Sequence, residues 1–164
     1  MDLLDAIRSG NDRTATSLIR AGKSLEFADE SGETPIFYAI RKDLPRLVDL
    51  MIEKGVNLDH ESEDDLTPLL LAASLGNNAI VKKLLKKVDV NSLNREGETA
   101  LHKAVETNSA PTVVLLLENE ADPNIISRKE ETPLSIAAAK GTRGRINLTA
   151  VSYTHLTLPT TPYV

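Results

Sequence analysis

The segment Thr34-Pro35-Ile36-Phe37-Tyr38-Ala39 is followed by three related segments along this 164-residue chain, and this repeated pattern decides the fold. The later copies are Thr67-Pro68-Leu69-Leu70-Leu71-Ala72, Thr99-Ala100-Leu101-His102-Lys103-Ala104 and Thr132-Pro133-Leu134-Ser135-Ile136-Ala137. Their threonines are 33, 32 and 33 residues apart. One further step of 33 residues before Thr34 reaches Met1, and apolar or small residues lie after it at the expected places. A fixed period of this size is typical of stacked structural repeats.

This phrase at this period resembles the ankyrin repeat, in which each unit buries its apolar face only against its neighbours. The resemblance implies an all-α repeat solenoid, built of stacked helix-turn-helix units that are joined by β-hairpin-like loops. We expect units at about 1–28, 29–61, 62–93, 94–126 and 127–150, the last of them incomplete.

The residue types within one unit predict two short helices. Thr is a good N-cap, and Pro suits the first helical position, where its missing N–H is not needed. The alanine five positions after Thr lets neighbouring first helices approach closely. Asp43 and Asn108 stand where the chain must turn. Apolar pairs one turn apart, such as Leu47-Val48 and Met51-Ile52, then predict a second helix with one buried face.

Glycines predict the end of each second helix, and some units lack them. Gly22 and Gly55 stand where a helix ends in a left-handed residue. Lys87-Val88 and Glu120 take this place in later units, and each replacement costs about 1 kcal/mol through the left-handed backbone penalty. The third and fifth loops carry Asp65 and Glu130 instead of a tip glycine, so we expect these turns to be looser.

The periodicity stops before the last fourteen residues, 151–164, which are rich in Thr and Pro and contain no Lys, Arg, Asp or Glu. A short β-strand or a disordered tail would fit this composition. The run from Val151 to Thr160 also resembles the translation of a transposon adapter used in sequencing libraries. We favour this last interpretation and expect 151–164 to be a non-native or disordered tail, with the array cut near Ala150. The apolar face of the last helices is then expected to be partly open.

Composition limits the classes of function. The chain has no Cys, so disulfides and thiolate chemistry are excluded. Its acidic start, Met1-Asp2-Leu3-Leu4-Asp5, does not resemble a signal peptide, and no apolar run is long enough to span a bilayer. The net charge of -5 argues against nucleic acid as a partner. We therefore expect a soluble, cytoplasmic, monomeric protein without membrane insertion.

No arrangement of residues indicates catalysis. We find no nucleophile with a base and no histidines at metal-ligand spacing, and we expect no enzyme, no metal site and no cofactor. His102 occupies the Thr-x-Leu-His place of the repeat, where the resemblance implies a structural side chain that bonds to neighbouring loops. The acidic run 61–65 lacks the ligand order of a calcium loop and predicts a solvated tip. Lys82-Lys83 and Lys86-Lys87 form a basic stripe, which we interpret as a solvated outer face.

What remains is a surface for another protein. The resemblance implies that partners bind to the loop tips and to the concave face of the first helices. Carried over position by position, it selects two sets of residues. The tip residues are Glu30, Ser31, Glu33, Glu63, Asp64, Leu66, Arg95, Glu96, Glu98, Arg128, Lys129 and Glu131. The first-helix residues are Arg41, Lys42, Ser74, Leu75, Glu106, Thr107, Ala139 and Lys140.

These residues show a trend in charge. The tips of the second and third units are acidic, whereas those of the fourth and fifth are mixed. A partner with a basic patch opposite Glu30 to Asp65 is one hypothesis, and binding that is insensitive to salt would count against it. Leu66 and Leu75 are candidate apolar anchors.

Three functions compete. The first is a stand-alone protein-binding module, either a scaffold or an inhibitor. The alternative is the N-terminal recognition arm of a longer, truncated protein with a downstream enzymatic or channel domain. Both predict the same surface and differ only in the chain expected beyond Ala150. The third, an enzyme within these residues, lacks a catalytic set.

Overall fold

The computed structural model describes residues 1–140. The expected second helix of the fifth unit and the tail at 151–164 lie outside the described residues. Over residues 1–140 all regular secondary structure is helical, as the repeat pattern predicts. The helices are α1 (Leu3–Arg8), α2 (Asp12–Arg20), α3 (Pro35–Arg41), α4 (Pro45–Glu53), α5 (Pro68–Ser74), α6 (Asn78–Leu84), α7 (Ala100–Glu106), α8 (Ala110–Glu118) and α9 (Pro133–Ala139).

The chain forms two compact units. Among the described residues, unit 1 consists of 1–72 and 79–88, and unit 2 of 73–78 and 89–140. The boundary passes through α5, so most of this helix belongs to unit 1 and its last residues belong to unit 2. Unit 1 thus contains α1 to α4 and nearly all of α6, and unit 2 contains α7 to α9.

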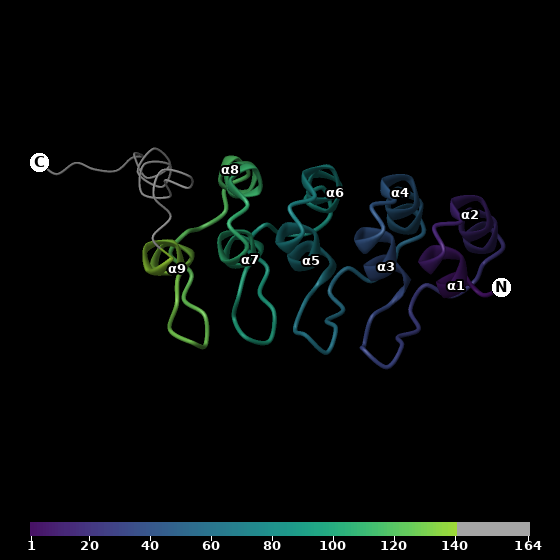
Figure 1. Cartoon of the computed structure of the whole chain (residues 1–164), viewed down its shortest axis with the longest axis horizontal. Helices are drawn as coiled ribbons and strands as arrows, with labels where there is room; N and C mark the ends of the chain where they lie inside the picture. The colour runs from purple at the N-terminus through teal and green to yellow at the C-terminus, as the bar shows by residue number, and fades with distance from the viewer. Residues whose placement is uncertain (141–164) are drawn as a thin grey trace, which may run out of the picture. The chain divides into compact units, whose positions relative to one another are not determined.

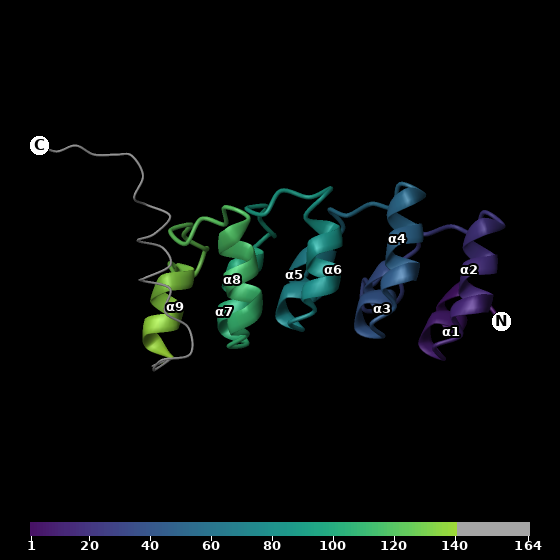
Figure 2. The same ribbon diagram turned by 90° about the horizontal axis from the view of Figure 1, so that it is seen from above.

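Unit 1 is built in two helical layers. α1 packs beside α3 and α2 beside α4, while each second helix also packs on its own first helix (Figure 1). Seen from above, α2 overlies α1 and α4 overlies α3 (Figure 2). The loops between α2 and α3 and between α4 and α5 project from the side of the first helices (Figure 1). The core between the layers is filled by large side chains with no more than 1 % exposure, including Ile7, Phe37, Leu47 and Met51.

Unit 2 repeats this packing around α7, which contacts both α8 and α9. Leu101 and Val105 of α7 are buried, and Val113, Leu116 and Leu117 of α8 form the predicted apolar face. The alanine five positions after each threonine is at most 5 % exposed in both units, from Ala6 to Ala137, so the prediction of close helix approach is confirmed. These positions leave no room for larger side chains.

The predicted left-handed helix ends are confirmed at Gly22, Gly55 and Glu120. Gly22 and Gly55 adopt φ of 87° and 79°, and Glu120 keeps the left-handed conformation at φ 69° although it is not glycine. The prediction is wrong for the third unit, where neither Lys87 nor Val88 has a positive φ, so the expected penalty does not arise there. α6 ends after seven residues, whereas α2, α4 and α8 each have nine. α6 ends early in the third unit, which is one residue shorter than its neighbours and has no glycine at this place. The predicted turns between helices at Asp43 and Asn108 are confirmed, and both residues adopt the left-handed conformation.

Candidate binding surface

Each loop tip is a turn whose backbone is held by its own first residue. In unit 1 the Asp29 N–H donates to the Glu33 carbonyl at 3.1 Å, while Asp29 Oδ1 accepts from the Ser31 and Glu33 amides at 2.9 and 3.1 Å. In unit 2, Asn94 makes the same pattern, and its Oδ1 accepts from the Glu96 and Glu98 amides at 3.0 and 2.8 Å. The tips are therefore fixed before any partner arrives.

The two tips that lack glycine keep the same shape as the others. Gly32 and Gly97 have φ of 69° and 71°, and Asp65 and Glu130 reach 58° and 62°. The hydrogen bonds of the loop hold the left-handed backbone against its steric penalty, so all four tips share one conformation. Ser127 illustrates this, because its N–H donates to the Glu131 carbonyl at 2.9 Å while its own carbonyl accepts from the Glu130 amide at 3.0 Å. That these two turns are looser stays a prediction.

Neighbouring tips within each unit are tied together through their backbones. The Glu63 N–H donates to the Ser31 carbonyl at 3.0 Å in unit 1, and the Arg128 N–H donates to the Glu96 carbonyl at 2.8 Å in unit 2. A Cβ added at Gly32 would lie 3.0 Å from the Glu63 nitrogen, so this glycine is needed both for its positive φ and for the close approach. The tips of each unit thus form one continuous, preorganised surface.

Two histidines strengthen these ties. His102 is fully buried, and its Nε2 lies 3.1 Å from the Glu131 carbonyl of the next loop. Its Nδ1 accepts from the Thr99 amide at 3.0 Å, which completes a capping box on α7. The predicted structural role of His102 is confirmed. His60, to which the sequence assigned no role, makes the equivalent tie in unit 1, where its Nε2 lies 2.7 Å from the Gly32 carbonyl.

Unit 1 presents the acidic part of the surface. Glu30, Ser31, Glu63 and Asp64 are exposed, and Leu66 is half-buried. Residues 24–34 and 57–67, which form the two loops of this unit, contain nine Asp or Glu and no Lys or Arg. The sequence placed two cations on this face, Arg41 at the end of α3 and Lys42 at its C-cap, and both are exposed.

Glu33 and Glu98 differ from the expected exposed tip residues. They are only 5 % and 3 % exposed, and each binds a cation of the first helix that comes after it. Glu33 Oε1 lies 2.5 Å from Arg41 Nη2 in unit 1, and Glu98 Oε2 lies 2.8 Å from Lys103 Nζ in unit 2. Both carboxylates therefore hold the tip against the helix instead of facing a partner. The sequence missed Lys103, although its position one turn into the helix was a usable signal.

A second network in unit 1 joins residues that are far apart in sequence. The Arg8 guanidinium donates to Asp29 Oδ2 at 3.1 Å and to the Tyr38 hydroxyl at 3.0 Å, and it lies 4.7 Å from the centre of the Tyr38 ring. Tyr38 in turn donates to Asp29. This cluster anchors the base of the first loop to both α1 and α3.

The buried carboxylates have shifted pKa values. Burial by itself raises the pKa of Asp29, but hydrogen bonds from Tyr38 and from two backbone amides outweigh it, and the pKa is lowered. Burial opposes the charge on Glu98 as well, yet the hydrogen bonds from Lys103 and Asn94 lower its pKa. For Lys103 the contacts with Glu98 and Glu106 outweigh burial and raise the pKa. All three groups are therefore charged at neutral pH.

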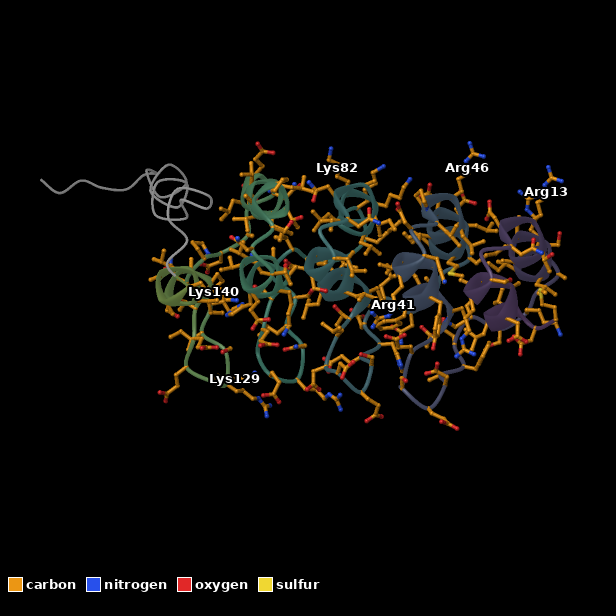
Figure 3. All side chains as sticks on the ribbon, viewed as in Figure 1. Arg13, Arg41, Arg46, Lys82, Lys129 and Lys140 are labelled. Carbon is orange, nitrogen blue, oxygen red and sulfur yellow. The ribbon has the colours of Figure 1, made fainter. Side chains whose placement is uncertain are left out.

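Unit 2 presents a mixed surface. Arg95, Arg128, Lys129 and Glu131 are exposed at the tips, and Figure 3 shows Lys129 at the end of its loop. Among the first-helix residues, Thr107 and Ala139 are exposed, and Ser74 and Glu106 are half-buried. Lys140 Nζ donates to the Glu106 carbonyl at 2.7 Å, which links the ends of α7 and α9. Leu75, the candidate apolar anchor, is 50 % exposed, and its role in binding stays a prediction.

Other kinds of site are not found in the part of the chain that the structure describes. Within residues 1–140, no three His, Asp or Glu side chains are grouped so that they could hold a metal ion. No helix in this range is long and apolar enough to cross a membrane.

Comparison with known proteins agrees with this geometry. A family model described as ankyrin repeats (3 copies) matches residues 3–93 and 69–151. The chain belongs to the ankyrin repeat family. Ankyrin repeats are non-catalytic modules of protein–protein interaction, and binding another protein is the function of this fold.

The similar curated proteins are much longer than this chain. Human neurogenic locus notch homolog protein 1 is 32% identical over 134 residues, which is 80% of this chain and 5% of that protein. The same protein from Xenopus tropicalis is 32% identical over 134 residues, and human neurogenic locus notch homolog protein 2 is 34% identical over 128 residues. The chain spans about 5% of the length of the curated relatives that it matches.

Proposed function

We propose that the ankyrin repeats of this protein recognise a basic segment of another protein through the acidic loops of unit 1. The observation that carries the proposal is the charge of residues 24–34 and 57–67, where nine acidic residues occur without a single Lys or Arg. Arg8 and Arg41 offset two of these carboxylates from the first helices. The exposed tips at Glu30, Glu63 and Asp64 remain available to a partner.

Preorganisation supports the same proposal. Because the Ser31 carbonyl accepts from the Glu63 amide, the two tips of unit 1 need not be ordered when a partner binds. Acidic groups on a rigid surface attract a basic partner over about 10 Å at 0.1 M salt and mainly raise its association rate. In this proposal the tips and Leu75 of unit 2 form a second contact region. The protein acts as a monomer and carries out no catalysis.

The test uses a defined probe. A fluorescein-labelled peptide that repeats Arg-Ala-Lys four times is titrated with the protein, and binding is followed by fluorescence anisotropy. The double variant Glu30→Lys with Glu63→Lys is expected to weaken binding at least about tenfold, since each substitution replaces an attraction by a repulsion. The matched control is Glu118→Lys, which reverses an exposed acid at the end of α8 in unit 2.

Three outcomes would contradict this proposal. The first is an equal loss of peptide affinity in the double variant and in the control. The second is a peptide affinity that stays constant when the salt concentration is raised from 50 to 300 mM. The third is a set of peptide-induced amide chemical-shift changes that does not include residues 30–31 and 63–64.

A further inference from the structure

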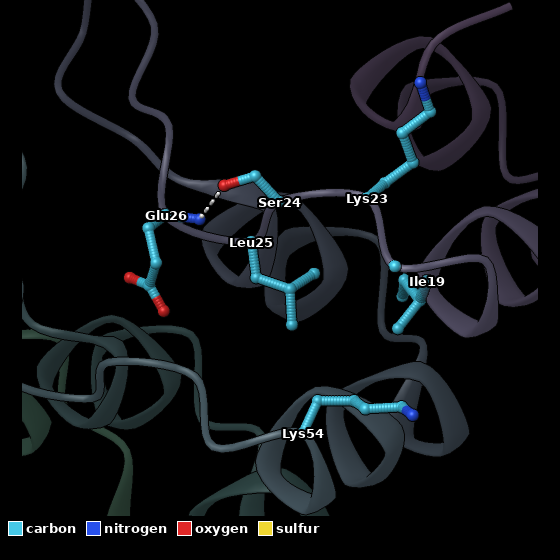
Figure 4. A pocket seen from close by; sticks show the side chains of 7 residues that line it. Ile19, Lys23, Ser24, Leu25, Glu26 and Lys54 are labelled. Atoms are coloured by element: carbon cyan, nitrogen blue, oxygen red, sulfur yellow. Dashed lines mark hydrogen bonds between the residues drawn. The ribbon is translucent and has the colours of Figure 1, made fainter.

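A shallow pocket lies at the end of the second-helix layer of unit 1. It occupies about 320 Å³ and is formed by the last turn of α2, the chain directly after it, and the C-cap of α4. Ile19 and Leu25 form its apolar floor and are 2 % and 8 % exposed, and Lys54 lies across the pocket from Leu25 (Figure 4). Lys23 stands at the edge. Glu26 also lines the pocket, but its Oε1 already accepts from the Asn57 amide at 2.9 Å.

The same pocket recurs one repeat later in unit 1. It occupies about 370 Å³, with Ile52 and Leu58 at the places of Ile19 and Leu25, and with Lys87 at the place of Lys54. The exposed Asp59 stands at the place of Glu26, so each pocket has one acidic residue beside its lysine. Each corresponding pair is 33 residues apart, so both pockets arise from the repeat itself. Each has apolar lining residues and a lysine that lies just after the end of the next second helix, Lys54 after α4 and Lys87 after α6.

The face that carries these pockets is strongly basic. Residues 11–23, 44–56 and 79–88, which form the second helices of unit 1 and their ends, contain nine Lys or Arg and three Asp or Glu. Arg13, Arg46 and Lys82 point away from the helices on the side opposite the loops (Figure 3). Arg13 and Arg46 lie in the first turns of α2 and α4, at the opposite helix ends from the pockets, where Lys23, Lys54 and Lys87 supply the positive charge. Of the three acids, Asp49 is paired with Lys83 at 2.6 Å. The corresponding residues 109–121 of unit 2 contain two Glu and no Lys or Arg, so the charge is not a general property of this layer.

We propose that the paired pockets and their basic rim bind an extended acidic protein segment with apolar side chains at every third position. Packed helices are about 8–10 Å apart, which sets the distance from one pocket to the next. A polyproline II segment advances about 3.1 Å per residue with three residues per turn, so residues i and i+3 lie about 9 Å apart on the same side. Apolar residues at this spacing enter consecutive pockets, and acidic residues between them meet Lys54 and Lys87.

A protein segment is favoured over two other anionic partners. Single-stranded nucleic acid is bound by aromatic stacking as well as charge, and the residues at 11–23, 44–56 and 79–88 include no Phe, Tyr or Trp. A membrane surface offers no apolar side chains at a fixed spacing for the pockets to receive. This surface includes the first residues of the acidic loops, 24–26 and 57–59, but not their tips at Glu30, Glu63 and Asp64. It goes beyond the function proposed for those tips.

The experiment measures a designed peptide. A fluorescein-labelled peptide repeating Leu-Glu-Pro four times is compared by anisotropy with Ser-Glu-Pro and Leu-Lys-Pro repeats of the same length. The first peptide is expected to bind at least tenfold more tightly than either control. The double variant Lys54→Glu with Lys87→Glu should weaken its binding about tenfold. Lys129→Glu, at a tip of unit 2, should leave binding unchanged.

A steric variant tests the pocket independently of charge. Ser24 is exposed and lines the first pocket, so Ser24→Trp should fill the space and weaken the Leu-Glu-Pro peptide several-fold, with circular dichroism and thermal melting confirming the fold. Three results would overturn the inference. The first is that the Leu-Glu-Pro peptide does not bind. The second is that the Ser-Glu-Pro peptide binds as tightly as the Leu-Glu-Pro peptide. The third is that Lys129→Glu weakens binding of the Leu-Glu-Pro peptide as much as the double lysine variant does. Lysine-dependent binding of phosphatidylserine vesicles without peptide binding would assign the face to a membrane instead, which would also overturn it.

Discussion

Replacing His102 by Phe tests whether buried polar ties, and not apolar packing alone, hold the loops to the helices. His102 is fully buried, accepts the Thr99 N–H through Nδ1 at 3.0 Å and reaches the Glu131 carbonyl through Nε2 at 3.1 Å. Phe has a similar shape but makes neither bond. The chain itself contains the comparison, since Phe37 stands at this place in unit 1.

The magnitude is set by the two lost hydrogen bonds. The buried Thr99 amide loses its partner, which costs about 1–3 kcal/mol. The loss of the tie to the next loop adds about 0.5–1.5 kcal/mol. We therefore expect His102→Phe to lower the free energy of unfolding by about 3 kcal/mol. Unit 1 tolerates Phe37 because His60 packs edge-on against its ring at 6.1 Å and supplies the tie to Gly32 from the other side.

The assay is equilibrium unfolding in urea, followed by circular dichroism at 222 nm. The control is Ser135→Ala, which removes the same capping box from α9 at an exposed position. Water replaces the lost partner there, so we expect a loss of only about 0.5–1 kcal/mol. Hydrogen exchange at the Thr99 amide should accelerate in His102→Phe. The reasoning is refuted if His102→Phe costs no more than Ser135→Ala.

Three further predictions concern strained or charged positions, each measured by urea unfolding. Glu120→Gly should raise the free energy of unfolding by about 0.5 kcal/mol, because φ is 69° there. Its control, Glu118→Gly at the last residue of α8, should lower the free energy of unfolding by about 1 kcal/mol. A lower free energy of unfolding in both variants would contradict the strain argument. Gly32→Ala should cost about 1 kcal/mol more than Gly10→Ala, since both have positive φ but only Gly32 faces a backbone atom at 3.0 Å; equal losses would contradict it. Glu98→Gln should reduce the loss of stability between about pH 5 and pH 3. The pKa of Glu98 is lowered by folding, so its contribution is complete above the ordinary carboxyl pKa and disappears as the pH falls through the lowered value; an unchanged acid slope would count against this.

The sequence predicted those features that a single repeat determines by itself. Thr and Pro fix where first helices begin, and the burial of the repeat alanine, at 0 % exposure in Ala39 and Ala104, is expected from the spacing alone. The burial of Glu33 and Glu98 could not be predicted in the same way. Each depends on whether a cation lies on the next helix within reach, and that cation is seven residues beyond the threonine in one repeat and four in the other.

Long-range ties were also beyond the sequence pattern. Arg8, Asp29 and Tyr38 belong to different helices and loops, and their separations of 21 and 30 residues match no period of the repeat. The left-handed backbone at Asp65 and Glu130 shows a second limit, because residue preference disfavours this conformation and the hydrogen bonds of the loop impose it. Local preference decides such a turn only when no tertiary contact opposes it.

The charges of unit 1 are the feature that stacking does not explain. Packing requires apolar, small and turn-forming residues at fixed positions, and it is indifferent to the sign of charge on loops or outer helices. Yet the loops of unit 1 carry nine acidic and no basic residues, while its second helices carry nine basic and three acidic residues. The attraction between the acidic residues of the loops and the basic residues of the second helices contributes little to stability, because salt screens it. Their separation onto two faces is therefore better explained by two kinds of partner, a basic one at the loops and an acidic one at the paired pockets.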